Sequence, residues 1–413
     1  MKKIIALALA LVMVFALCAC GSAAPAQEAA PAAASADASA APAAAPAEAA
    51  AVKAALVCLH DENSGYDANF INAFKAACEA CGIEYVIKTN IAEDQAANDA
   101  CCELADEGYN LIITDSYGHQ QYVLEAAKEF PEVQFTSCTG DMALAENVAN
   151  YHNAFATIFE GRYIAGVAAG MKLNEMIENG DITAEEAKMG YVGAMPYAEV
   201  KSGYTSFYLG AKSVCPSVTM DVVFTGSWYD ETLEKEGAES LIAGGCVLIS
   251  QHADSMGAPN ACEAAGVPNV SYNGSTQEAC PNTYIISSRI NWQPYFEYAI
   301  KALQAGENFD TDWCGTLNTE SVLLTELNEN VAAAGTAEKL EAVKADLNSG
   351  AIKVFDTANW TVGGETLTSY LANVVPDANF EAETEVIADG IFDESVLRSA
   401  PYFDIDIDGI TIK

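Results

Sequence analysis

Aromatic, carboxylate, amide and hydroxyl side chains recur just after the apolar runs that the sequence predicts to be strands. The first such loop, HDENSGYD at residues 60–67, carries Asp61, Asn63 and Tyr66. The other candidates follow later runs and are Ser116, Tyr117, Trp228, Asp230, His252, Asp254 and Asn273. Stacking a flat ring on an aromatic side chain contributes about 1–3 kcal/mol. Amides, hydroxyls and carboxylates beside it can hydrogen-bond to ring N–H groups or sugar hydroxyls. The pattern predicts a binding site for a small, flat ligand.

Catalytic motifs do not accompany these residues. The sequence contains no GxSxG, GxxxxGK[ST] or HExxH pattern, and its four histidines, His60, His119, His152 and His252, lack metal-ligand spacing. His252 and Asp254 could serve as a base and its orienting acid, but no activated nucleophile accompanies them. We therefore predict a binding protein that is not an enzyme and needs no cofactor.

The cysteines do not form a recognisable metal site either. The close pairs, Cys78/Cys81 and Cys101/Cys102, lie in helix-like stretches without a second CxxC, so no zinc site is expected and the thiols are interpreted as small and half-buried. The tail DIDIDGITIK at residues 404–413 begins like a calcium loop, but the position for its bidentate glutamate lies beyond Lys413. An edge strand with a turn is the preferred interpretation, and no metal is predicted.

Short apolar runs that alternate with helical ones must position the candidate residues. A first block has such runs at 53–59, 83–89, 110–116 and 133–138, and a second at 188–194, 218–226, 246–252 and 269–273. Unbroken β-branched and aromatic runs suit strands buried on both faces of a parallel sheet. We predict an α/β fold with two doubly wound units in series.

The two units are expected to form hinged lobes around a cleft. The run at 283–290 and the helix from Trp292 are predicted to cross back to the first unit. The first lobe then comprises residues 52–155 plus about 275–315, and the second 156–274 plus about 316–413. Ligands of open α/β sheets bind beyond the carboxyl ends of the strands, where the candidate residues lie.

The N-terminus predicts export and lipid anchoring. Lys2 and Lys3 precede an apolar stretch at 4–19 that is shorter than the roughly 20 residues of a membrane-spanning helix, which indicates a signal peptide over 1–19. Leu17 to Cys20 fits the bacterial lipobox, so Cys20 is the expected acylated residue, carrying palmitate-like chains. An ordinary secretory signal cleaved near Ala19 is the alternative. Residues 20–51, rich in Ala and Pro, are the predicted tether to the extracytoplasmic face of the cell membrane.

The charge balance excludes one class of partner. With 19 Lys and Arg against 58 Asp and Glu, the formal net charge is −39. Phosphate backbones would repel such a chain, and no basic cluster relieves the repulsion, so nucleic-acid binding is not expected.

Several long segments resemble the basic membrane lipoprotein family, the purine nucleoside or nucleobase substrate-binding proteins of ATP-driven (ABC) importers. They are NVANYHNAFATIFEGRYIAGVAAG (147–170), GYVGAMPYAEV (190–200), the stretch 210–245, ISQHADS (249–255) and ISSRINWQPYF (286–296). The resemblance implies a periplasmic-binding-protein type I-like fold with two lobes joined by a hinge. It implies capture of a purine by hinge closure and delivery to a membrane permease.

The resemblance also implies roles for individual residues. Tyr66 and Trp228 match the two aromatics that hold the purine. The polar matches are Asp61, Asn63, Ser116, Tyr117, His252 and Asp254, the last two in the branch that takes free bases. Asn273 and Ser275 stand where nucleoside-binding relatives have ribose-binding aspartates, and an expected base-reading aspartate is replaced around Thr139, which favours a free base.

Three alternatives stay open from the sequence. The same fold could bind riboflavin or a sugar. It could serve as a sensor subunit that reports ligand occupancy to a membrane kinase. An exported nucleoside hydrolase is the third possibility, and it would need a catalytic carboxylate cluster or bound calcium.

Overall fold

The computed structural model describes residues 51–376 and 382–413. The predicted signal peptide, Cys20 and nearly all of the predicted tether lie outside these residues. Within the described ranges, every helix is too short or too polar to cross a bilayer.

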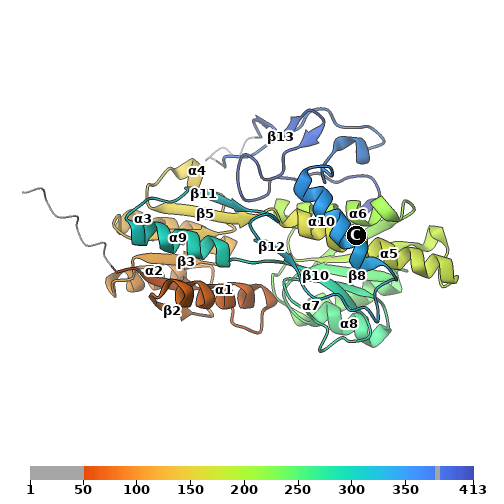
Figure 1. The fold of residues 1–413 in the computed structure, drawn as a ribbon, viewed down its shortest axis with the longest axis horizontal. Coiled ribbons are helices and arrows are strands. Elements are labelled where there is room, and N and C mark those ends of the chain that lie inside the picture. The colour runs from red at the N-terminus through yellow and green to blue at the C-terminus, as the bar shows by residue number, and fades with distance from the viewer. Residues whose placement is uncertain (1–50, 377–381) are drawn as a thin grey trace, which may run out of the picture. The chain divides into compact units, whose positions relative to one another are not determined.

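Two open sheets organise the chain (Figure 1). The first has the order β11-β5-β4-β3-β1-β2, and its pairings are all parallel. Its strands are β1 (Lys53–Val57), β2 (Glu84–Lys88), β3 (Leu111–Thr114), β4 (Gln134–Cys138), β5 (Tyr151–Ala156) and β11 (Asp312–Gly315). Its helical segments are α1 (Gly65–Cys81), α2 (Gln95–Asp106), η1 (Tyr117–His119), α3 (Gln120–Glu129), α4 (Ala143–Glu146) and α9 (Gln293–Ala305). We refer to these elements as the first lobe.

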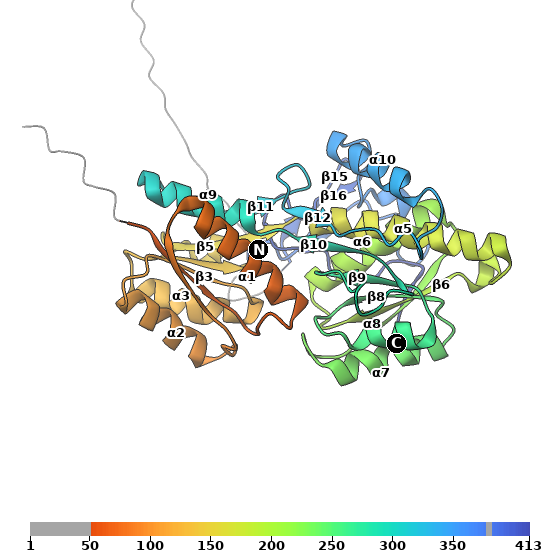
Figure 2. The same ribbon diagram turned by 60° about the horizontal axis from the view of Figure 1, so that its bottom comes forward.

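The second sheet has the order β12-β10-β9-β8-β6-β7-β17 and is parallel except for β12, which runs antiparallel to β10. Its strands are β6 (Lys188–Gly193), β7 (Thr219–Phe224), β8 (Leu248–His252), β9 (Asn269–Tyr272), β10 (Tyr284–Ile290), β12 (Val322–Leu324) and β17 (Ile410–Ile412). Its helical segments are α5 (Ile158–Asn179), η2 (Ala184–Glu186), α6 (Ala198–Val214), α7 (Glu231–Ala243), α8 (Gly257–Ala265) and α10 (Thr336–Ser349). These elements form the second lobe (Figure 2).

Each sheet reverses its strand order once, and these reversals locate the site. In the first sheet β1 pairs with both β2 and β3, and in the second β6 pairs with both β7 and β8. The chain therefore leaves neighbouring strands toward opposite faces and opens a crevice at their carboxyl ends. This arrangement confirms the predicted doubly wound α/β fold with two lobes.

One predicted strand placement is wrong. The run at 283–290 does not cross back to the first unit, because β10 pairs with β9 inside the second sheet. Only the next element, α9, returns to the first lobe, where the Trp292 ring stacks on Phe70 of α1 with centroids 4.3 Å apart. The crossing thus falls after Ile290, and the part of the predicted first lobe between 284 and 290 belongs to the second sheet.

The sequence also left some strands unpredicted. β5 continues the first sheet beyond the run at 133–138, and β11 and β12 are short edge strands of the two sheets. The tail forms β17, which pairs in parallel with β7, so the predicted edge strand with a turn is confirmed. All eleven cysteines from Cys58 to Cys314 are unpaired thiols, eight of them buried rather than half-buried.

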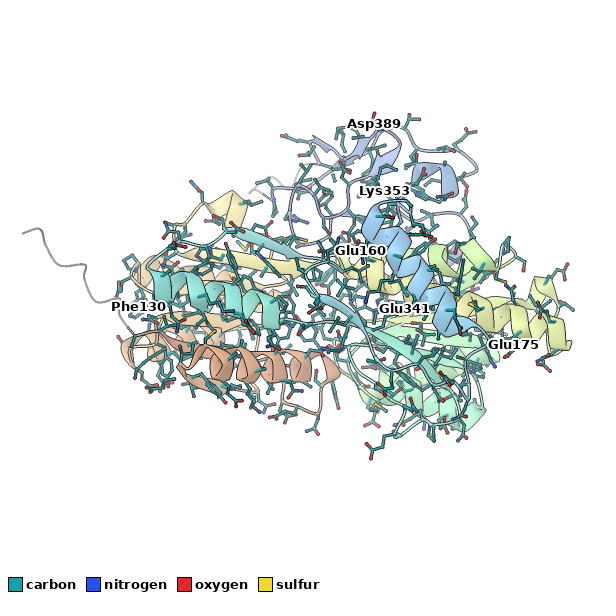
Figure 3. The ribbon with its side chains drawn as sticks, viewed as in Figure 1. Phe130, Glu160, Glu175, Glu341, Lys353 and Asp389 are labelled. Carbon is teal, nitrogen blue, oxygen red and sulfur yellow. The ribbon has the colours of Figure 1, made fainter. Side chains whose placement is uncertain are left out.

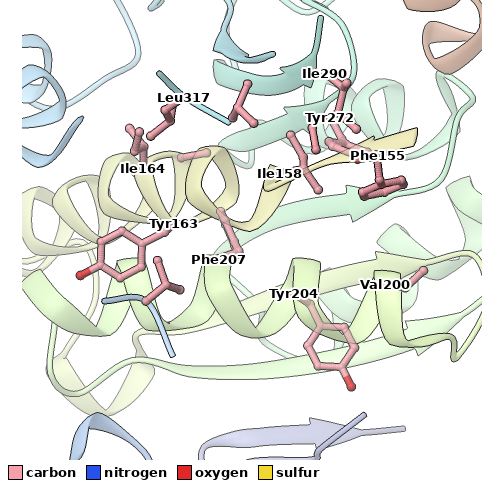
Figure 4. Packing of buried hydrophobic residues seen from close by; sticks show 14 of the residues in the cluster. Phe155, Ile158, Tyr163, Ile164, Val200, Tyr204, Phe207, Tyr272, Ile290 and Leu317 are labelled. Atoms are coloured by element: carbon pink, nitrogen blue, oxygen red, sulfur yellow. The ribbon is translucent and has the colours of Figure 1, made fainter. Parts of the chain in front are cut away.

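Close packing between α5 and α6 forms the centre of the second lobe's core (Figure 4). A Cβ on Gly166 would lie 2.0 Å from the backbone oxygen of Phe207, and one on Gly210 would lie 2.0 Å from that of Tyr163. Only glycine permits this approach of two backbones. On its other side α5 packs against α10, and Figure 3 labels Glu175 and Glu341 on these two helices.

The C-terminal segment that follows α10 covers α6. It contains η3 (Thr357–Asn359), β13 (Leu371–Ala372), β14 (Thr384–Glu385), β15 (Ile387–Ala388) and β16 (Ile391–Phe392). Its own small core includes Phe355 stacked on Phe403 with centroids 4.6 Å apart. Lys201 of α6 lies 2.7 Å from Asp404. The segment also reaches the first sheet, since the Ser399 N–H donates to Asp312 of β11 at 2.7 Å.

Candidate ligand-binding site

A cavity lies between the carboxyl ends of the strands of the two sheets. About 400 Å³ of space there is not filled by atoms, counting the part that is open to solvent. Its lining residues come from both lobes and are Leu59, His60, Tyr66, Ser116, Tyr117, Thr139, Glu199, Trp228, His252, Asp254, Tyr272 and Asn273. Both topological reversals therefore meet at one site.

The first-lobe wall is held by the capping of α1. Ser64 is the N-cap and its hydroxyl accepts a hydrogen bond from the Asp67 N–H, while the Asp67 carboxylate accepts from the His60 N–H at 2.7 Å. These bonds satisfy donors of the first helical turn and shape the loop after β1. Tyr66 follows the cap, packs against Phe70 with centroids 5.0 Å apart, and donates its hydroxyl to the backbone oxygen of Asp115. Its ring is thereby held at the cavity wall.

A turn after β7 presents Trp228 from the second lobe. The turn begins at Gly226, whose φ of 75° favours glycine. The Trp228 backbone oxygen accepts from the Asp254 N–H at 3.0 Å, which ties this turn to the loop after β8. Buried Glu234 strengthens the connection, because its carboxylate accepts from the N–H groups of both Asp230 and Ser255. These hydrogen bonds therefore hold in place the turn that carries the Trp228 indole.

His252, Asp254 and Glu199 form the polar floor of the cavity in the second lobe. Burial lowers the pKa of His252, so its ring is neutral. Burial, followed by the fields of nearby carboxylates, raises the pKa of Asp254 well above its ordinary range, which favours its protonated form. Glu199 lies in the first turn of α6, with Oε1 3.5 Å from His252 Nε2. Such hydrogen-bond donors and acceptors suit a polar ligand.

Tyr272 also lines the cavity, and the buried guanidinium of Arg162 lies over its ring. Its ring lies 4.6 Å from the His252 ring and 3.4 Å from the guanidinium carbon of Arg162. Arg162, on α5, is fully buried and donates to the backbone oxygen of Gln251 at 3.1 Å. A cation over an aromatic face is favourable, increasingly so when desolvated. The guanidinium and the His252 ring thus both pack against the Tyr272 ring.

Two lining residues have left-handed backbone conformations. Thr139 has a φ of 60° and Asn273 a φ of 63°. Asparagine tolerates this region, but a β-branched residue adopts it at a cost of order 1–3 kcal/mol. Strain of this kind clusters at binding sites, and Thr139 has it directly after β4.

Ten residues were singled out from the sequence as ligand-binding, and seven of them line the cavity. These are Tyr66, Ser116, Tyr117, Trp228, His252, Asp254 and Asn273. Asp61, Asn63 and Asp230 do not line it. The Asp61 carboxylate accepts from the backbone and side chain of Asn63 in a local turn, and Asp230 caps α7 by accepting from the Leu233 N–H at 2.9 Å. Their hydrogen-bonding capacity is used in turn and cap formation.

The cavity also contains lining residues that were not proposed as ligands. They are Leu59, His60, Thr139, Glu199 and Tyr272. Four of these end a strand or follow one within a few residues, so the rule that singled out Tyr117 could have found them. Glu199 is different, because it follows β6 only after an intervening turn.

Three contacts join the two lobes beside the cavity. The Asn69 side chain donates to the backbone oxygen of Asn273 at 2.7 Å. The His60 and Tyr229 rings lie 5.5 Å apart, and the Tyr117 and Tyr197 rings 5.8 Å apart. Each of these pairs joins the first lobe to the second. The structure therefore corresponds to a closed arrangement of the two lobes.

Comparisons with known proteins match most of the chain. A family model described as ABC transporter substrate-binding protein PnrA-like matches residues 60–354. The purine-binding protein of Brucella abortus (strain 2308) is 29% identical over 308 residues, which cover 73% of this chain and 84% of that protein. The putative ABC transporter glucose-binding protein TsgA13 of Haloferax volcanii is 30% identical over 231 residues, covering 56% and 55%.

Solved structures show the same fold. An ABC transporter solute-binding protein from Aeropyrum pernix K1 superimposes with a TM-score of 0.62 at 19% identity, covering 73% of this chain and 92% of that one. At this identity the likeness concerns the fold, and it agrees with two lobes enclosing one cavity.

Proposed function

This chain belongs to the PnrA-like family of ABC transporter substrate-binding proteins, and we propose that its ligand is a purine nucleobase or nucleoside. Proteins of this class bind a small molecule outside the cytoplasm and deliver it to a membrane permease. Here the ligand enters the open form, the lobes close around it, and the permease recognises the closed form.

The observation that carries the proposal is the pair of aromatic rings on opposite lobes. Tyr66 comes from the first turn of α1 and Trp228 from the turn after β7, and both line the same cavity. A flat heterocycle between them would contact both lobes at once. Its binding energy would then favour the closed form over the open one.

The polar side chains favour an uncharged ring over a sugar phosphate or a free anion. His252, whose pKa is lowered by burial, and Asp254, whose pKa is raised by burial, supply donors and acceptors that match the ring nitrogens and exocyclic groups of a purine. Asn273 and Ser275 occupy the positions where the family resemblance implies ribose-binding aspartates. We propose a free base as the preferred ligand, because these positions offer no carboxylate to the ribose hydroxyls.

Calorimetry on the purified protein tests the ligand class. We expect one-to-one binding of adenine, guanine, hypoxanthine or xanthine, and weaker binding of the matching nucleosides. Tight binding of nucleosides with weak binding of bases would overturn the preference for a base while keeping the purine assignment. Absence of binding for every purine tested would reject the purine assignment itself.

A sugar is the second candidate, and one comparison favours it. The Haloferax volcanii relative carries the name of a putative glucose-binding protein, and aromatic rings also stack on sugar faces. Glucose and other sugars therefore belong in the same calorimetric series, as does riboflavin. A response to one of these without a response to purines would replace the proposed ligand and leave the family unchanged.

The membrane anchor forms part of the same proposal. We propose that the mature chain begins at Cys20 and carries acyl chains there, which hold the protein at the extracytoplasmic face of the cell membrane. Anchoring keeps the binding protein near its permease and raises its effective concentration there. Mass spectrometry of the mature N-terminus should find an acylated Cys20 peptide. An unmodified N-terminus elsewhere in residues 18–30 would contradict the anchor.

A further inference from the structure

A buried cluster of metal-ligating groups lies directly behind the first-lobe wall of the cavity. Cys58, Asp67 and Asp115 are all buried, and each offers one ligand atom within 4.8 Å of the others. Cys58 follows β1, Asp67 lies in the first turn of α1, and Asp115 follows β3. The cluster therefore joins the two strand ends that flank the reversal of the first sheet.

A fully buried histidine adds an independent observation. His119 Nε2 lies 2.9 Å from the backbone oxygen of Ile91, which can only accept, so this nitrogen carries the ring proton. Nδ1 is then left with a free lone pair, finds no hydrogen-bond partner in residues 51–376 or 382–413, and lies 4.0 Å from an Asp115 carboxylate oxygen. A metal-bound histidine has this arrangement, with one nitrogen donating to a backbone oxygen and the other facing the ion.

Each carboxylate of the cluster also has one buried oxygen without a hydrogen bond to any described residue. The Oδ2 atoms of Asp67 and Asp115 make no hydrogen bond within the described part of the chain. His60 Nδ1 lies 3.5 Å from Asp67 Oδ2. Burying such oxygens without partners is costly. A cation between them would remove that cost.

We propose that Cys58, Asp67, Asp115 and His119 bind one divalent transition-metal ion of the zinc class. Thiolate and imidazole ligands select this class over Mg²⁺ and Ca²⁺, which prefer oxygen ligands alone. Ligand atoms around a tetrahedral zinc ion stand roughly 3–4 Å apart. Those of Cys58, Asp67 and Asp115 lie within 4.8 Å of one another, and His119 Nδ1 lies 4.0 Å from Asp115, so small side-chain shifts would bring the four groups onto one ion. Four protein ligands would close the coordination shell, which is typical of a structural site.

The ion would stabilise the wall of the ligand cavity without touching the ligand. Leu59 and His60 follow Cys58 directly, and Ser116 follows Asp115, and all three line the cavity. An ion bound by both Cys58 and Asp115 would therefore fix the loop after β1 relative to the loop after β3. This inference stands apart from the choice between purine and sugar, because it concerns atoms outside the cavity.

Cobalt titration of the purified, chelator-treated protein tests the site. We expect one Co²⁺ per chain, with the near-ultraviolet charge-transfer band of thiolate ligation and the visible bands of a tetrahedral site, and displacement by Zn²⁺. Cys58→Ser should remove the charge-transfer band. His119→Gln should weaken Co²⁺ binding at least about tenfold. Zn²⁺ should raise the melting temperature of the parent but not of these variants.

A matched control separates this site from binding at other thiols. Cys101 is also fully buried, but it lies on α2 outside the cluster, so Cys101→Ser should bind Co²⁺ with the parent's spectrum. Asp115→Asn, nearly unchanged in volume, provides a further variant should Cys58→Ser fail to fold, and it should also lose tight binding. Absence of stoichiometric Co²⁺ binding, or an unchanged spectrum in the folded cluster variants, would overturn the proposal.

Discussion

Trp228→Ala should weaken ligand binding by about 1–3 kcal/mol, which corresponds to about 5- to 150-fold in Kd. The indole lines the cavity from the second lobe, and its removal takes away one of the two stacking faces. The turn itself should persist, because its links to the loop after β8 are made by backbone groups and Glu234. Calorimetry with the ligand found in the series above measures the loss.

Tyr66→Ala should have an effect of the same size from the opposite lobe. Tyr66→Phe separates the two functions of this side chain, because it keeps the ring and removes only the hydroxyl that donates to Asp115. We expect Tyr66→Phe to bind nearly as well as the parent. Tyr122→Ala, on α3 and outside the cavity, is the control for loss of a half-buried tyrosine. Parent-like binding by both Trp228→Ala and Tyr66→Ala would show that the ligand does not stack between them.

Glu394→Gln should raise the free energy of unfolding by up to about 3 kcal/mol at pH 8–9. Glu394 is 3% exposed and accepts hydrogen bonds from the hydroxyls of Ser202 and Ser395. Burial raises its pKa to about 7, with a further contribution from the charge of Glu160. Above pH 7 the folded protein must therefore keep a buried charge that the unfolded chain exposes to water. Glutamine removes that charge at nearly constant volume, and a serine hydroxyl can accept from its amide.

The pH window identifies the cause of this stabilisation. In the unfolded chain the Glu394 pKa returns to its ordinary value near 4.5, so between about pH 7 and 4.5 the folded state binds more protons than the unfolded state. The advantage of Glu394→Gln should therefore shrink as the pH falls through this window and vanish below it. Denaturant unfolding at several pH values measures it. An equal difference at pH 4 and pH 9 would mean that packing, not titration, is responsible.

Glu385→Gln is a control of opposite sign. This exposed carboxylate accepts from the Ser369 hydroxyl and from the N–H groups of Tyr370 and Ile387, which lower its pKa to about 2. Its stabilising contribution is present above the ordinary glutamate pKa and is lost as the pH falls through 2. Glu385→Gln should therefore reduce stability at neutral pH, where Glu394→Gln increases it.

The fold class could be predicted because it depends on local patterns. Runs such as residues 54–57 in β1 and 111–113 in β3 are apolar at successive positions, as expected of strands buried on both faces. Alternation of these runs with helices then implies parallel sheets, and the loops after the strands follow as the place for a site. Seven of the ten proposed ligand residues line the cavity for this reason.

The exceptions arise where side chains are used locally. Asp61, Asn63 and Asp230 are also strand-exit residues, yet a turn and a helix cap use their oxygens. Asp, Asn and Ser side chains bond equally well to a ligand or to a nearby backbone N–H. Sequence position alone does not distinguish the two uses.

The sequence by itself determined the alternation of elements, the family resemblance and the strand-exit positions of most cavity residues. Only the tertiary structure decided that β10 stays in the second sheet, that the lobes meet through Asn69 and Asn273, and that His119 faces Asp115 beside Cys58. The reason is that hydrophobic periodicity depends on near neighbours along the chain. Sheet order and the meeting of distant polar groups depend instead on which buried surfaces pack together.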